Sequence, residues 1–246
     1  MSKERETERK RESTKTGLFQ NSKLANSNLC KKRIYLTIVI NYLNYSALTF
    51  VDVILYTGIF VFAVTGALKA RAHRMDILGG AVLAFVTAYG GGTLRDLLMG
   101  VRVGWMNDNL PLILVAGAVV AVSLVKKDLA AFEKVIFFTD AIGLAMFTAG
   151  GIEKSLVFGI SEIYSVLLGV MSATFGGLIA DLLSGRTPSL FQKGELYATA
   201  SAIGGIVYIL LKHLNVSSNF SLVICVVIVV LVRIVSRKRG IALPHI

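Results

Sequence analysis

Residues 88–100, AYGGGTLRDLLMG, place three consecutive glycines, Gly90, Gly91 and Gly92, just before a charged pair, Arg95 and Asp96, at the end of a long apolar run. Glycine in a helix interior costs about 1 kcal/mol relative to alanine, and charge is expensive near hydrocarbon. Together these residue types are typical of a polar cavity or pathway through a membrane. Close helix packing is an alternative explanation for the glycines taken alone.

The segments that carry such residues have the length of membrane spans. The chain has 246 residues, of which 54% are hydrophobic and 17% are charged. Its mean hydropathy is +0.69. Because about 20 apolar residues cross a hydrocarbon core as a helix, we expect an all-α polytopic membrane protein. Seven transmembrane helices are expected, at 52–69, 77–99, 110–125, 135–152, 163–184, 196–211 and 219–235.

An internal repeat relates the two halves of the chain. When residues 55–100 are compared with 140–185 without a gap, 12 of 46 positions are identical. The opening motif has a second copy, in which Gly176, Gly177 and Asp181 match Gly91, Gly92 and Asp96. Apolar helices that resemble each other by chance share mostly Leu and Val, whereas glycines and charges dominate here. We therefore infer a true repeat.

Each repeat contains three expected helices, so the second copy enters the membrane from the opposite side. Inverted repeats are typical of proteins that form a pathway across the bilayer, although duplication could also have built only a larger bundle. The expected organisation is a basic, disordered tail, an apolar extension, repeat 1, repeat 2, a seventh helix and a C-terminal tail. These parts span 1–33, 34–51, 52–127, 134–212, 219–236 and 237–246.

The intramembrane charges are the candidate site. Asp96 and Asp181 would lie near opposite mouths of the pathway, where carboxylates attract cations; capping or pairing is the structural alternative. Arg95 and Asp96 diverge by about 100° on a helix, so we expect each to reach a different helix as well. Lys69 and Lys154 occupy equivalent helix ends, where snorkelling to the interface is the favoured interpretation. Asp140 is expected at the start of the fourth helix.

Other classes of function find no support in the sequence. The two cysteines and three histidines are isolated, so no metal site, disulfide or cofactor is expected. No nucleophile–base set is visible, and GGGTLRD lacks the spacing of a phosphate-binding loop, so no enzyme is expected. The net charge of +11 does not indicate nucleic acid, because ten of the 26 Lys and Arg residues lie in residues 1–33.

Charge asymmetry favours one orientation. With the N-terminus outside, 12 Lys and Arg residues beyond the tail lie inside and three lie outside, which puts the C-terminus in the cytoplasm. The ten cations of the tail conflict with this orientation. Either residues 34–51 form an eighth helix, or the natural start lies near Leu48 or Val51, the alternative that we favour. Mass spectrometry of the mature N-terminus distinguishes the two.

The elements GIFVFAVTGALKA, RMDILGGAVLAFVTAYGGGTLRDLL, TDAIGLAMF, GGLIADLLSGRTP and ELYATASAIGGIVYI resemble the prokaryotic trimeric intracellular cation (TRIC) channel family. That family is also labelled a glycine transporter family. The resemblance covers about residues 52–240 and implies seven helices, a homotrimer and one cation pore in each subunit. It further implies that the second and fifth helices are kinked at their glycine motifs and line the pore.

The second motif departs from the family pattern. It has Phe175 in place of the first glycine and Ala180 in place of the arginine. We expect Phe175 to narrow or gate the pathway. The resemblance implies a potassium-permeable channel of a prokaryotic plasma membrane; a carrier for a small solute such as glycine is the alternative.

Overall fold

We describe the protein from a computed structural model, which defines residues 49–107, 109–125, 129–192 and 196–241, with the backbone alone at 129–132. The expected tail 1–33, most of the extension 34–51 and the last residues 242–246 lie outside the described part. Residues 49–246 belong to one compact unit. Its helices are α2 (Phe50–Ala72), α3 (Ile77–Leu98), η2 (Gly104–Met106), α4 (Leu110–Leu124), α5 (Leu129–Val157), α6 (Glu162–Leu183), η3 (Ser189–Phe191), α7 (Ala198–His213) and α8 (Ser218–Arg239).

The start of α2 is defined by a capping box. The Thr49 hydroxyl accepts a hydrogen bond from the Asp52 backbone N–H, and the Asp52 carboxylate accepts one from the Thr49 N–H at 3.0 Å. Such reciprocal bonds satisfy donors that a helix N-terminus leaves unpaired. Because the Thr49 backbone is itself extended, the first span begins at Phe50. The Thr49–Asp52 spacing was a readable signal for this boundary.

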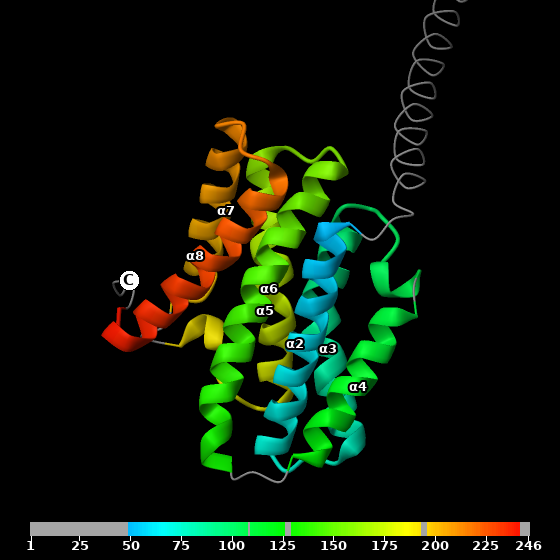
Figure 1. The fold of residues 1–246 in the computed structure, drawn as a ribbon. Helices are drawn as coiled ribbons and strands as arrows, with labels where there is room; N and C mark the ends of the chain where they lie inside the picture. The colour runs from blue at the N-terminus through cyan, green and yellow to red at the C-terminus, as the bar shows by residue number, and fades with distance from the viewer. Residues whose placement is uncertain (1–48, 108, 126–128, 193–195, 242–246) are drawn as a thin grey trace, which may run out of the picture. The chain divides into compact units, whose positions relative to one another are not determined.

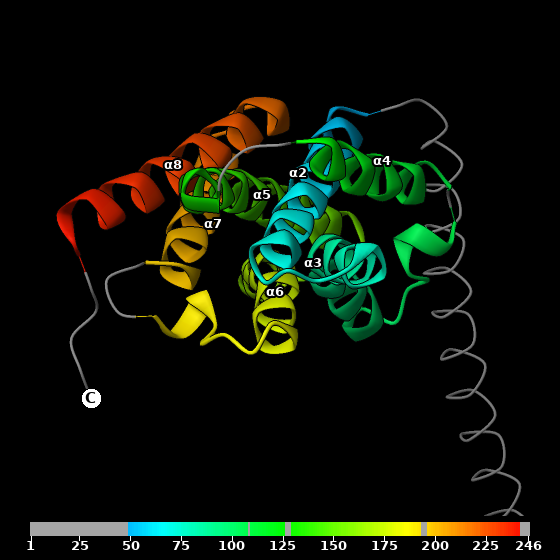
Figure 2. The same ribbon diagram turned by 90° about the horizontal axis from the view of Figure 1, so that it is seen from below.

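Four long helices, α2, α3, α5 and α6, form the centre of the bundle (Figures 1 and 2). Helix α4 packs on α2 and α3, and α7 packs on α5 and α6, so the third helix of each repeat lies against its own first two. Helix α8 packs on α5 and α7, at the side away from α4. The two repeats meet where α2 contacts α5 and α3 contacts α6.

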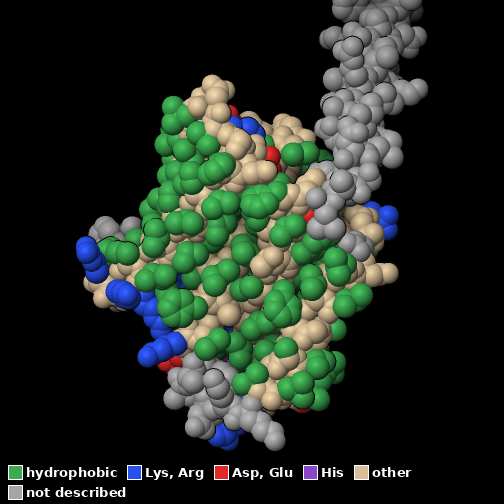
Figure 3. Space-filling model, in the orientation of Figure 1, with side chains coloured by type: hydrophobic (Ala, Val, Ile, Leu, Met, Phe, Trp, Pro, Cys, Tyr) green, Lys and Arg blue, Asp and Glu red, His purple; other side chains and the backbone are tan. Residues whose placement is uncertain are grey.

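Five of the described helices, α2, α3, α5, α6 and α8, are long and apolar enough to cross a membrane. Helices α4 and α7 are apolar but shorter, with 15 and 16 residues. Apolar side chains cover much of the face seen in Figure 3. Large exposed hydrophobic side chains occur on every long helix, as a lipid-facing surface requires. The chain is a multi-pass membrane protein.

The inverted repeat is visible in matched contacts. Phe62 and Phe147, which occupy equivalent positions in the two repeats, stack on each other with ring centroids 5.1 Å apart. Gly66 of α2 packs against Ala84 of α3, and the equivalent Gly151 of α5 packs against Gly169 of α6. The short helices η2 and η3 also begin at equivalent positions of the two repeats. The expected fold class, two inverted three-helix repeats plus a seventh helix, is confirmed.

One local expectation was wrong. Helix α5 begins at Leu129 rather than near 135, so Asp140 lies well inside the helix and is no helix-end charge. Glu133 and Lys134 interrupt the apolar pattern, and this interruption hid the first turn of the helix, residues 129–132, which is apolar. Helices α3 and α6 are assigned as α-helix through their glycine motifs, and the expected kink at these motifs stays a prediction.

Candidate functional site

The paired glycines lie where α3 and α6 cross. A Cβ atom at Gly91 would overlap the Ser172 backbone carbonyl, and one at Gly176 would overlap that of Thr87. These two contacts are equivalents of each other, since Ser172 occupies in the second repeat the position that Thr87 occupies in the first. Small residues permit such close approach of two helix backbones. Packing, the alternative weighed for the glycines alone, is therefore what Gly91 and Gly176 do in this structure.

The first buried ion pair joins the two repeats. Lys69, in the last turn of α2, lies with its Nζ 2.6 Å from Asp181 Oδ1 of α6, and both side chains are 4% exposed. The other carboxylate oxygen accepts hydrogen bonds from the Ser189 backbone N–H at 2.9 Å and the Ser189 hydroxyl at 3.1 Å. Lys69, Asp181 and Ser189 form what we call the Asp181 half-site.

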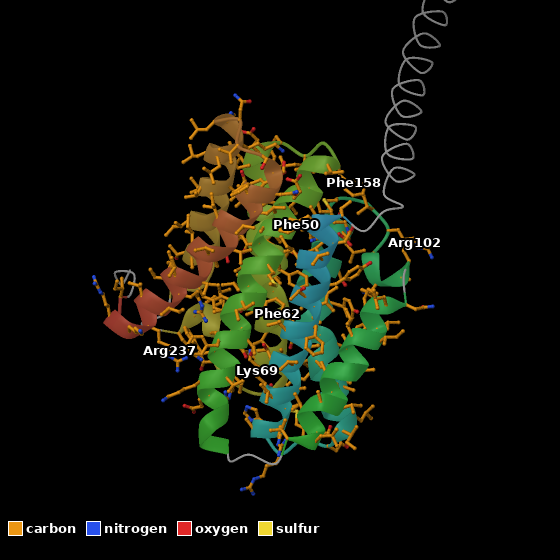
Figure 4. The ribbon with its side chains drawn as sticks, viewed as in Figure 1. Phe50, Phe62, Lys69, Arg102, Phe158 and Arg237 are labelled. Atoms are coloured by element: carbon orange, nitrogen blue, oxygen red, sulfur yellow. The ribbon has the colours of Figure 1, made fainter. Side chains whose placement is uncertain are left out.

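We call the equivalent cluster of Asp96, Arg95 and Lys154 the Asp96 half-site. It lies at the end of the bundle opposite Lys69, the end at which Figure 4 labels Arg102 and Phe158. Lys154 Nζ of α5 is 3.0 Å from Asp96 Oδ2 of α3, and this oxygen also accepts the Gly104 N–H at 3.0 Å. Arg95 binds Asp96 Oδ1 through Nε at 3.0 Å and Nη2 at 2.8 Å. Arg95 Nη1 additionally donates to the Ser172 hydroxyl of α6 at 3.2 Å.

These contacts correct the expectations for the charged residues. Lys69 does not snorkel to an interface, because it is buried in an ion pair with the other repeat. Asp96 and Asp181 both hold cationic side chains in this conformation, so neither presents an unoccupied carboxylate. Arg95 and Asp96 bind each other, and each also reaches a different helix, as expected. Phe175 is half-buried next to the Gly176 crossing.

The shared Asp-Leu-Leu-x-Gly sequence also ends each helix. Gly100 and Gly185 both have φ of +68°, a left-handed conformation that favours glycine. The following residue donates back to the Asp carbonyl, from Val101 to Asp96 at 3.0 Å and from Arg186 to Asp181 at 2.9 Å. This is the Schellman pattern of helix termination. Each aspartate is thus held at a fixed helix end facing the opposite repeat.

A third buried cluster has no counterpart in repeat 1, where Leu55 stands in place of Asp140. Asp140 Oδ2 is 3.2 Å from Arg233 Nη2 of α8, and Asp140 Oδ1 accepts the Tyr197 hydroxyl at 3.1 Å. The Arg233 guanidinium lies over the rings of Tyr197 and Phe137. Sequence reasoning missed Arg233, which it counted among interfacial cations, although a lone arginine inside VLVRIV is a signal for a buried partner.

Metal-binding geometry is absent from the part of the chain that the structure defines, where no three His, Cys, Asp or Glu side chains converge. The clusters found there each combine one carboxylate with one or two cationic side chains. A buried pair of this kind loses much of its hydration, so it persists only with good geometry and with its remaining hydrogen bonds satisfied. In both half-sites each carboxylate oxygen accepts at least one hydrogen bond.

Known proteins share this arrangement. The sequence model of the glycine transporter family matches residues 52–126 and 137–213, two stretches that start at equivalent positions of the two repeats. A UPF0126 membrane protein of Vibrio cholerae is 35% identical over 189 residues, covering 76% of this chain and 79% of that protein. The chain belongs to the glycine transporter (UPF0126) family. The inner membrane protein YadS of Escherichia coli is a further relative, 32% identical over 76% of this chain and 91% of its own length.

Solved structures of TRIC channels have the same fold. A TRIC trimeric intracellular cation channel orthologue from Rhodobacter sphaeroides is 30% identical, with a TM-score of 0.72. The likeness covers 79% of this chain and 100% of that one, so the chain belongs to the prokaryotic TRIC family as well. A prokaryotic TRIC channel in 0.5 M KCl is 28% identical with a TM-score of 0.70, over 78% of this chain and 98% of that one.

Proposed function

We propose that the protein is a potassium-permeable cation channel of a prokaryotic plasma membrane, with a pore in each protomer of a homotrimer. The observation that carries the proposal is the pair of Lys–Asp contacts between the repeats, one buried and one partly buried, within a fold that covers the whole of a TRIC channel orthologue. Proteins with inverted repeats place their pathway at the interface between the two copies. Both ion pairs lie at that interface, one toward each end.

The chemistry of each half-site suits a monovalent cation. A lysine ammonium is a compact single positive charge with strong hydration, as a potassium ion is. In each half-site the lysine ammonium is bound to the carboxylate with which a permeating cation would otherwise interact. The described conformation is therefore a closed one, and conduction requires each lysine to leave its carboxylate. A carboxylate near each mouth then favours cations over anions.

The second candidate is a carrier for a small solute such as glycine. It is favoured by the family whose sequence model matches both repeats, and two barriers at opposite ends also suit alternating access. A carrier must open one barrier while the other stays closed, whereas a channel must open both at once. The two candidates therefore differ in whether the half-sites can be open together.

Recording from purified protein in planar bilayers tests the proposal. With potassium chloride on both sides, we expect unitary currents that reverse near the potassium equilibrium potential under a gradient. Proteoliposomes preloaded with glycine supply the parallel assay. Saturable glycine counterflow without unitary currents would replace the channel with the carrier. The double variant Lys69→Met/Lys154→Met, which removes both ammonium groups, is expected to raise the open probability of a channel.

Orientation follows from the distribution of cations. The 12-to-three bias of Lys and Arg residues beyond the N-terminal tail supports a cytoplasmic C-terminus of α8 and an external start of α2. The Asp181 half-site is then cytoplasmic and the Asp96 half-site is external, because α2 and α6 end at the same side as α8.

A further inference from the structure

The two half-sites are equivalent by the repeat but unequal in charge. Asp181 holds one cation, Lys69, and fills its second oxygen with uncharged donors of Ser189. Asp96 holds two cations, because Arg95 occupies Oδ1 and Lys154 occupies Oδ2. The position equivalent to Arg95 is Ala180, which is fully buried and carries no charge. The difference in charge between the two half-sites is therefore one arginine, and the only other difference among these donors is the Ser189 hydroxyl, which the equivalent Gly104 lacks.

Lys154 is held less closely than Lys69. Its Nζ is 3.0 Å from the carboxylate, against 2.6 Å for Lys69, and its side chain is 22% exposed, against 4%. Arg95 binds the other oxygen of the same carboxylate, so Lys154 faces a like charge across Asp96. Two cations share one carboxylate here, so the attraction left for each is reduced.

Arg95 is the partner that stays. It makes two charge-assisted hydrogen bonds to a single oxygen of Asp96 and a third to Ser172 of α6, and it is buried. A guanidinium that donates several hydrogen bonds at once is bound more firmly than a lysine ammonium on a flexible side chain. When the pair at this end opens, Lys154 is accordingly the group that leaves, and Asp96 keeps a compensating charge after the departure.

We propose that Arg95 acts as a built-in competitor that makes the Lys154–Asp96 pair the labile one of the two, while the Lys69–Asp181 pair persists. The unequal binding of the two lysines does not depend on the proposed channel function. The further statement, that the labile pair is the barrier which opens first to a cation, does rest on that function.

Amine acetylation of the full chain in lipid nanodiscs tests the unequal hold. Both ends of the protein are accessible there, and N-hydroxysuccinimidyl acetate followed by peptide mass spectrometry gives a rate for each lysine. We expect Lys154 to react at least about tenfold faster than Lys69, the ratio that one charge-assisted hydrogen bond would produce. Equal rates, or a faster Lys69, would overturn the proposal.

The variant Arg95→Gln removes the competitor. We expect the Lys154 rate to fall about tenfold, toward that of Lys69, whereas Arg95→Lys, which keeps the charge, leaves Lys154 fast. Arg102→Gln is the matched control, because Arg102 is an exposed arginine at the same end of the molecule and has no place in the half-site. The Lys69 rate in each sample reports on folding, and Arg95→Met replaces Arg95→Gln if that rate rises. An unchanged Lys154 rate in the folded neutral variant contradicts the proposal.

Potassium currents test the channel function separately from the competitor role of Arg95. If the wild-type protein conducts, Arg95→Gln is expected to lower its open probability severalfold, with Arg102→Gln unchanged. If it passes no potassium, the channel function fails while the acetylation rates still decide the competitor role. Conduction that is unaltered in a variant with a slowed Lys154 would show that this pair is not the barrier.

Discussion

At the scale of single residues, neighbours in one glycine triplet have different tasks. Gly91 lies against the Ser172 carbonyl of α6, where a Cβ has no room. At Gly92 the nearest atoms to an added Cβ are 3.7 Å away on Phe147 and 3.9 Å away on Arg95, which is ordinary contact. The triplet therefore contains one glycine required by packing and one that the described conformation does not require.

Alanine substitutions separate these two glycines. Gly91→Ala forces the backbones of α3 and α6 apart, and we expect a loss of about 2 kcal/mol or more, seen as a fall of roughly 5 °C in Tm in detergent. Gly92→Ala is the matched control and should leave Tm unchanged or higher, since alanine favours a helix. Equal Tm values for the two variants would show that the α3–α6 contact is not as close as described.

At the scale of elements, α8 is attached to the repeats by charge. The buried Arg233 side chain of α8 pairs with Asp140 of α5. The Tyr197 hydroxyl, at the start of α7, donates a hydrogen bond to the same carboxylate. The Gly177 backbone is close by, with an added Cβ 2.7 Å from the Tyr197 hydroxyl. Helix α8, the seventh membrane helix, is therefore linked to the second glycine motif through this cluster.

Breaking and replacing this pair gives opposite results. Arg233→Leu leaves the Asp140 carboxylate buried and uncompensated, and we expect a loss of about 3–5 kcal/mol, measured as a sharp fall in folded yield and Tm. The double variant Asp140→Leu/Arg233→Leu removes both charges and should recover most of the loss. Leucine already stands at the position equivalent to Asp140, at Leu55. Failure of the double variant to recover would mean that the pair is needed for more than charge balance.

Periodicity and the repeat were enough to predict the helices, their order and their inverted relation. Pairing could not be predicted in the same way, because it depends on side chains that approach from different helices. Lys69 and Asp181 are 112 residues apart, and the sequence around either residue does not identify the other as its partner. The repeat did contain the missing information in part, since equivalent lysines and equivalent aspartates must meet across a twofold relation if one such pair does.

At the scale of the whole molecule, the cation bias predicts the orientation. Green fluorescent protein fused after residue 246 should fluoresce in a bacterial host, because it folds only in the cytoplasm, and alkaline phosphatase at the same place should be inactive. Fusion after Leu214, in the loop that separates α7 from α8, is the matched control and should give the reverse pattern. The opposite pair of results would exchange the cytoplasmic and external half-sites.

Helices α4 and α7 have 15 and 16 residues, which at 1.5 Å per residue gives about 22 and 24 Å. A typical hydrocarbon core is about 30 Å thick. Apolar side chains of α4, such as Ile113 and Val120, are exposed on the surface of the bundle. Lipids beside these two helices must shorten or tilt to match them, and each ångström of mismatch costs a fraction of a kcal/mol. Because the other five helices have 22 to 29 residues, we expect the bilayer to thin locally beside α4 and α7 and not around the whole protein.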